Sequence, residues 1–157
     1  MSLSTRWGVA VAVICAAGIY AGVARSDDTA VLDGRIAVMK AQGKDMTGIK
    51  AYIDDKADLA SAQAAGADLV LQVAKIPDLF PKGTGMAEMP GKSYAKPEIW
   101  ANWDKFLAQA KTANEKAVAL NAALKGGDKA AITAAFGDMG KNGCGACHEP
   151  FREKKPS

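Results

Sequence analysis

Two cysteines and the single histidine of this chain lie together near its C-terminal end. Cys144 and Cys147 are separated by two residues, and His148 follows the second cysteine directly. Thiols at this spacing can form thioethers to both vinyl groups on one edge of a porphyrin, and the adjacent imidazole can then bind the iron. The pattern therefore predicts one covalently attached haem c, held by Cys144 and Cys147, with His148 as an iron ligand.

The same residues could instead form a C-x-x-C redox pair beside an incidental histidine. In thioredoxin-like proteins such a pair follows a strand in an α/β chain. Here the surrounding chain is alanine-rich and only 6% aromatic, a composition that favours helices over sheets. The context therefore favours haem attachment.

Composition excludes several other classes of function. The 157 residues, 49% of them hydrophobic, are typical of one compact domain. A formal net charge of +3, mixed in sign along the chain, does not suggest nucleic-acid binding. One histidine cannot build bis-histidine haem ligation or a zinc site that needs two histidines. It also leaves no distal histidine for acid–base work on a peroxide, so we expect no enzyme activity.

The N-terminal segment has the pattern of a signal peptide. Arg6 provides a basic start, residues 7–23 carry no charge, and small residues precede the expected cleavage point after Ala24. Removal of residues 1–24 would leave a mature domain of residues 25–157 in the periplasm, with no membrane attachment. The alternative is an uncleaved membrane anchor, because the apolar run approaches spanning length.

The body of the chain shows four amphipathic segments. Apolar residues recur every three or four positions in residues 28–53 and 56–75, in a segment that starts near Pro97 and ends at Gly126, and in one that opens at Asp128. Asp28 and its neighbours are expected to cap the first of these helices. The apolar seam of the third helix is the most regular: Ile99, Trp103, Phe106, Ala110, Ala113, Ala117, Leu120 and Leu124.

Residues 77–96 have no helical period and contain three prolines and three glycines. We expect them to form a long crossover loop between the second and third helices, with short connections elsewhere. This arrangement predicts an all-α, antiparallel four-helix bundle. Gly137, Gly140 and Gly143 precede the cysteines, and small residues there would give a flat macrocycle room to approach the backbone.

Over essentially the whole mature region, the chain resembles the class II cytochromes c, the cytochrome c-prime family. The resemblance rests on three motifs: Cys144-x-x-Cys147-His148 followed by Phe151-Arg152, Lys96-Pro97-Glu98-Ile99-Trp100, and Arg35-x-x-x-Met39. It implies a bundle-core haem with His148 as proximal ligand and Arg35 near a propionate. By itself Arg35 could also be a solvated charge that pairs with a carboxylate such as Asp33.

In this family the residue at the position of Met39 lies over the distal face of the iron. High-spin members often have leucine there, whereas low-spin members have a methionine whose sulfur binds the iron. The resemblance therefore implies an electron carrier with His148 and Met39 as axial ligands. The alternative is that Met39 only packs in the core, as methionines on apolar seams commonly do. The protein would then be a five-coordinate, high-spin haem protein that binds nitric oxide or carbon monoxide.

The resemblance also implies redox partner proteins and a homodimer formed through the first two helices. Ala60, Ala64 and Ala67 would permit the close helix packing that such a dimer needs. Trp100 and Trp103 are expected to be core residues that also wall the haem.

Overall fold

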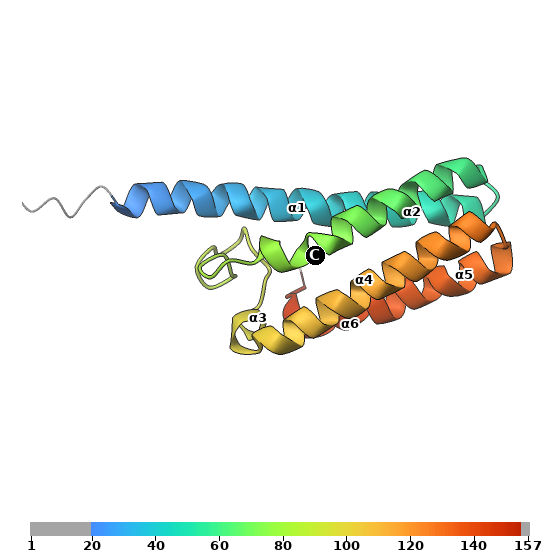
Figure 1. The fold of residues 1–157 in the computed structure, drawn as a ribbon. Helices are drawn as coiled ribbons and strands as arrows, with labels where there is room; N and C mark the ends of the chain where they lie inside the picture. Colours follow the sequence, from blue (N-terminus) through green and yellow to red (C-terminus); the bar gives the residue numbers. More distant parts are fainter. Residues whose placement is uncertain (1–19, 155–157) are drawn as a thin grey trace, which may run out of the picture.

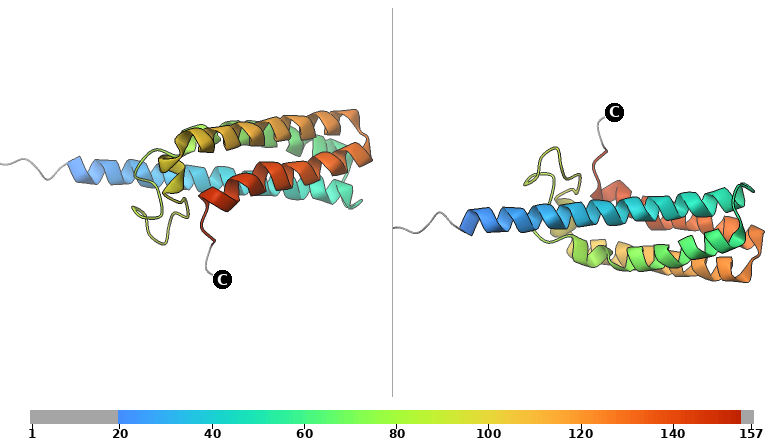
Figure 2. Two further views of the ribbon diagram at one scale, coloured as in Figure 1. Left: turned by 90° about the horizontal axis from the view of Figure 1, so that it is seen from below. Right: turned by 90° about the horizontal axis from the view of Figure 1, so that it is seen from above.

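The computed structural model describes residues 20–154, in which helices form an antiparallel four-helix bundle (Figures 1 and 2). The described residues contain no β-strand, and the predicted all-α bundle is confirmed. The elements, in chain order, are α1 (Tyr20–Ile53), α2 (Leu59–Ala74), the 3₁₀ helix η1 (Ile76–Leu79), α3 (Glu98–Ala101), α4 (Trp103–Gly126), α5 (Lys129–Asp138), the π-helix η2 (Met139–Gly145) and α6 (Ala146–Phe151).

The first helix starts earlier than its sequence pattern predicts. Asp28 lies within α1 rather than at its N-terminus, so the expected cap is wrong for the chain as it stands. Cleavage after Ala24 would bring Asp28 into the first turn or two of the helix. The signal peptide remains a prediction, because residues 1–19 lie outside the described residues. Among residues 20–154, no helix is long and apolar enough to cross a membrane.

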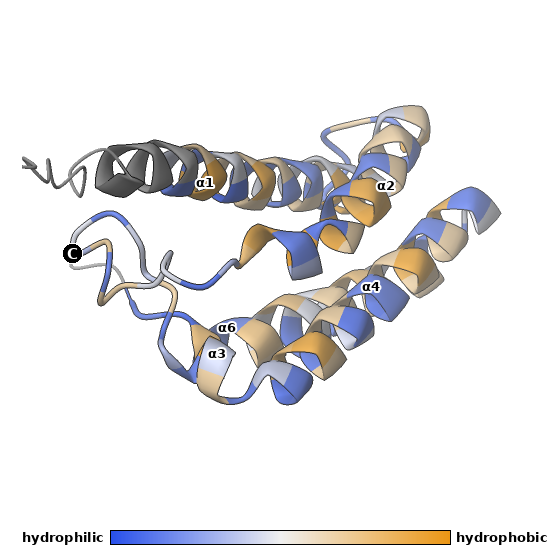
Figure 3. Cartoon of the chain, turned by 60° about the vertical axis from the view of Figure 1, so that its left-hand side comes forward, coloured by the Kyte–Doolittle hydropathy of each residue, from blue (hydrophilic) through white to orange (hydrophobic). Residues whose placement is uncertain are grey.

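The bundle core follows the predicted seams of α2 and α4. Figure 3 shows hydrophobic and hydrophilic stretches alternating along both helices. The two helices pack closely at Gly66, where a Cβ atom would lie 2.4 Å from Cδ1 of the fully buried Leu124. Every predicted apolar residue from Phe106 to Leu124 on the α4 seam is buried.

Side-chain and glycine caps fix the helix ends. Asp58 accepts a hydrogen bond of 2.7 Å from the amide of Ser61 at the start of α2, and Asp128 does the same for Ala131 at the start of α5. Gly127 ends α4 in the left-handed region, with φ of 76°. The predicted third helix is interrupted at Asn102, whose φ of −128° and ψ of 50° separate α3 from α4.

The connection between α2 and α3 is irregular after η1 and lies at one end of the bundle (Figure 1). Its last residues pair with the C-terminal segment. Ala95 and Arg152 form an isolated antiparallel bridge. The amide of Lys96 donates to the carbonyl of Phe151 at 3.0 Å, and that of Glu153 donates to the carbonyl of Tyr94 at 2.8 Å. These two hydrogen bonds make up the bridge, which we call the terminal clasp, and they join the crossover loop to the end of the cysteine-bearing helix.

Candidate haem site

A cavity of about 530 Å³ lies within the bundle, between α1 and the C-terminal helical segment. Its apolar walls come from α1, α2, η1, α3 and α4, and the end of the crossover loop closes one side. The cavity brings together all the residues that the sequence nominates for the site: Arg35, Met39, Cys144, Cys147 and His148.

A π-helix precedes and includes the first cysteine. The wider π turns of Met139–Gly145 shift the phase of the helix just before Cys147 and His148, and such turns are frequent at functional sites. At Gly143, which lines the cavity, a Cβ atom would lie 2.9 Å from the sulfur of Met139. At Gly137 and Gly140 the same atom would meet nothing within 4 Å. At Gly143 the side chain of Met139 takes this space, and the approach of a macrocycle to the backbone remains a prediction.

Burial shifts the pKa values of the histidine and of both cysteines in the motif. It lowers the pKa of His148 to about 4, with a further contribution from the positive charge of Arg152. The imidazole is neutral at pH 7, as a metal ligand must be. Burial raises the pKa of Cys144, and burial and Cys144 together raise that of Cys147 to about 11. A redox-active C-x-x-C pair has a lowered cysteine pKa instead. The site therefore lacks the electrostatics of a thioredoxin-like centre.

Arg35 lines the cavity and is only 5% exposed. Its guanidinium donates to the carbonyl and the hydroxyl of Thr84, at 2.7 and 3.1 Å, and to the hydroxyl of Ser93 at 2.9 Å. It also lies 4.6 Å from the ring centroid of Phe80. Burial lowers the pKa of Arg35 to about 10, so the side chain stays charged at pH 7. These contacts with the crossover loop are a role that the sequence did not indicate, and the propionate contact remains a prediction.

Met39 lies one turn after Arg35 on α1, is half-buried and packs against the core. Gln42, three residues further, also lines the cavity and is 9% exposed. Sequence reasoning missed Gln42, although its spacing from Arg35 and Met39 places it on their face of the helix.

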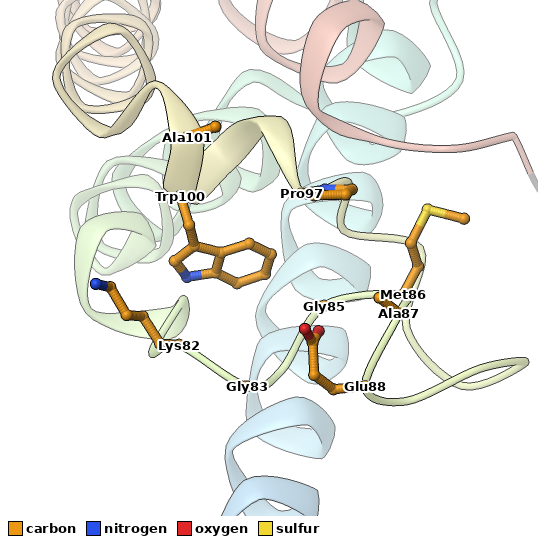
Figure 4. A pocket seen from close by; sticks show the side chains of 9 residues that line it. All are labelled: Lys82, Gly83, Gly85, Met86, Ala87, Glu88, Pro97, Trp100 and Ala101. Atoms are coloured by element: carbon orange, nitrogen blue, oxygen red, sulfur yellow. The ribbon is translucent and has the colours of Figure 1, made fainter.

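The expectation for the two tryptophans is met only in part. Neither Trp100 nor Trp103 lines the haem cavity, so their assignment as haem-wall residues is wrong, while both pack against the core as expected. Ile99 and Phe106 line the cavity from this part of the chain. Trp100 borders a separate cavity of about 400 Å³ beside Gly85 and Glu88 (Figure 4). Its indole nitrogen donates to the carbonyl of Phe80 at 3.0 Å.

The residues present fit a covalently bound haem. The cavity combines two thiols, a neutral imidazole and mainly apolar walls, and its volume lies within the range of about 300–1,000 Å³ that is usual for ligand sites. Arg35 adds a cationic group to the lining, with which a haem carboxylate could pair.

Comparison with known proteins supports this fit. Residues 30–152 match the family model described as cytochrome C'. The chain is 31% identical over 144 residues to cytochrome c-556 of Agrobacterium fabrum, which covers 90% of this chain and 89% of the relative. It is 41% identical over 78 residues to cytochrome c-554 of Cereibacter sphaeroides, a match that spans 50% of this chain and 56% of the relative.

Two solved structures share the fold at similar length. One is a variant of cytochrome c prime from Alcaligenes xylosoxidans in its nitric oxide complex, with a TM-score of 0.71, 27% identity, and coverage of 82% of this chain and 97% of that one. The other is a cytochrome c' described by its ligand-controlled dimer dissociation, with a TM-score of 0.73, 26% identity, and coverage of 81% and 97%.

Proposed function

Since this chain belongs to the cytochrome c' family, we propose that it is a haem c protein that binds diatomic gases such as nitric oxide or carbon monoxide. The observation that carries the proposal is the apolar cavity with Cys144, Cys147 and His148 in its wall. The nitric oxide complex of a structural neighbour supports a gas ligand in particular.

Each part of the site has a distinct task. Cys144 and Cys147 hold the haem through two thioethers, and His148 offers a neutral imidazole to its iron. Ile99, Phe106 and other apolar side chains of the wall exclude water from the cavity. When bound, the haem would supply the iron at which a small neutral gas binds.

Absorption spectra of the full-length holoprotein test this function. We expect a high-spin ferric spectrum at neutral pH and clear changes when carbon monoxide or nitric oxide is added to the ferrous protein. A ferrous spectrum that changes with neither gas would refute gas binding. Cys144→Ala and Cys147→Ala should each leave a single thioether, which the pyridine haemochrome spectrum detects.

The position of Met39 favours a second function, electron transfer. Met39 lines the same cavity as His148, and its thioether could complete a six-coordinate iron. A low-spin ferric spectrum that becomes high-spin in Met39→Ala would support this function over the first. In that case the protein would exchange electrons with redox partner proteins rather than bind gases. Neither function makes the protein an enzyme.

We also propose where the protein is located and how it assembles. We infer that residues 1–24 direct the protein to the periplasm and are then removed by cleavage. We also infer a homodimer through α1 and α2, since Ala60, Ala64 and Ala67 form an exposed stripe on α2 that continues to Leu71, a side chain 62% exposed. A structural neighbour described by its dimer dissociation supports the second inference. Light scattering of the holoprotein would refute it by giving the mass of a monomer at micromolar concentration.

A further inference from the structure

Gln42 is a buried amide in a wall that is otherwise mainly apolar. It is 9% exposed, lines the haem cavity, and its Nε2 atom has no hydrogen-bond partner among residues 20–154. A primary amide carries two N–H donors, and native proteins rarely bury such donors without an acceptor. An amide in this position therefore points to an acceptor that the chain itself does not supply.

The neighbouring polar groups do not use this donor. Asp45, three residues later on α1, is also buried, and its Oδ2 atom likewise lacks a partner. Side chains three residues apart on a helix are within reach of each other. An amide directed along the helix toward Asp45 would pair with that carboxyl oxygen, so the two unpaired atoms indicate that the Gln42 amide points elsewhere.

The other buried polar residue of the α1 wall is already engaged. Arg35 gives its hydrogen bonds to Thr84 and Ser93 in the crossover loop. Gln42 is therefore the buried, unpaired donor that α1 presents to the cavity, one turn from Met39. By the family resemblance, Met39 marks the distal side of the iron.

We propose that Gln42 donates a hydrogen bond to the diatomic gas held on the distal side of the cavity. The inference rests on the proposed gas-binding function and deepens it. Such a bond stabilises a ligand whose outer atom carries partial negative charge, and it slows ligand release. Gln42 would thus make the pocket discriminate between gases by polarity, which an all-apolar pocket cannot do.

The carbon monoxide complex of the ferrous holoprotein provides the test. Gln42→Leu keeps a similar volume and removes the donor. We expect the C–O stretching band to move to higher wavenumber and carbon monoxide to leave about fivefold faster, the factor that corresponds to a hydrogen bond of about 1 kcal/mol. Gln42→Ile, which also lacks the N–H donors, should shift the band in the same direction. An unchanged band in both variants would overturn the proposal.

A matched control separates this effect from the general effect on the bundle of losing a glutamine side-chain amide. Gln63 on α2 donates its amide to the carbonyl of Leu124 at 2.9 Å and does not line the cavity. Gln63→Leu should leave the C–O band and the release rate as in the wild type. A shift of equal size in this control would attribute the Gln42 effect to bundle stability and would also overturn the proposal.

The same measurements in a Met39→Ala background distinguish the two hypotheses. This change opens the sixth position even if the thioether occupies it in the wild type. If the wild type does not take up carbon monoxide and the Met39→Ala protein does, gas binding by the wild type is refuted. The effect of Gln42→Leu can then still be measured in the Met39→Ala protein. Failure of both proteins to take up the gas would overturn both hypotheses.

Discussion

The guanidinium of Arg35 in α1 donates a 2.7 Å hydrogen bond to the main-chain carbonyl of Thr84, 49 residues later in the chain. The same nitrogen donates to the hydroxyl oxygen of Ser93, and the Ser93 hydroxyl in turn donates to the Thr84 carbonyl at 2.8 Å. Thr84 is fully buried and Ser93 is 3% exposed. One charged side chain therefore fastens two points of the crossover loop to the helix that carries Met39.

Replacing Arg35 should loosen this loop. Arg35→Leu leaves the buried carbonyl and hydroxyl of Thr84 without their charged donor, so we expect the free energy of unfolding to fall by about 1–3 kcal/mol. Proteases should also cut faster between residues 80 and 93. Urea denaturation and limited proteolysis measure the two effects. Arg35→Lys keeps the charge without the planar fork and should recover only part of the loss; full recovery would contradict the assigned geometry.

Shortening Met39 should separate the two candidate functions in a single variant. Met39→Ala removes a half-buried side chain from the cavity wall and widens the space beside it. If the protein binds gases at an open position, its ferric spectrum stays high-spin and carbon monoxide binds faster. If it carries electrons, the wild type is low-spin, and the variant becomes high-spin with a lower reduction potential. Stopped-flow mixing and redox titration measure these outcomes.

A buried carboxyl should make stability depend on pH. Burial, together with repulsion from Asp68, raises the pKa of Asp45 from 3.8 to about 6. Because the folded protein binds this proton more tightly than the unfolded chain, Asp45 contributes stability at low pH that is lost as the pH rises from about 4 to about 6. Asp45→Asn should therefore raise the melting temperature at pH 7 and flatten its fall between pH 5 and pH 7.

Asp68→Asn is the control for this effect. It removes the repulsion and leaves the burial, so the pKa of Asp45 should move back toward its ordinary value and the pH dependence should weaken without vanishing. An Asp45→Asn protein with the wild-type pH profile would show that another group causes the dependence.

The contact between α2 and α4 should not tolerate a methyl group at Gly66. A Cβ atom there would lie 2.4 Å from Leu124, a side chain with no exposed surface, so Gly66→Ala should lower stability by about 1–3 kcal/mol. Gly43→Ala is the matched control. Gly43 is an exposed glycine within α1 with nothing within 4 Å of its added Cβ, so this change should raise stability by up to about 1 kcal/mol. Thermal unfolding of both variants tests the contrast.

The features that could be predicted from the sequence are those encoded by residues close together in the chain. The spacing of Cys144, Cys147 and His148, and the apolar seam from Phe106 to Leu124, need only a few turns of helix to be recognised. Both are found in the structure, the first in the wall of one cavity and the second in the core.

The features that sequence missed depend on residues far apart or on subtle backbone geometry. Arg35 and Thr84 meet only once the bundle has folded, so no local pattern pairs them. The π-helix before Cys147 differs from an α-helix in that each hydrogen bond spans one more residue, which the glycine-rich sequence allows but does not specify. Gln42 resembles any polar residue until its burial is known.

The terminal clasp also determines how the two sides of the cavity are connected. Ala95 pairs with Arg152, a residue 57 positions later in the chain. Arg152 lies four residues after His148, so the clasp ties the backbone beside the predicted iron ligand to the crossover loop. Arg35 holds the same loop through Thr84 and Ser93. The helix that carries Met39 and the segment that carries His148 are therefore linked by hydrogen bonds through one loop, in addition to their packing in the core.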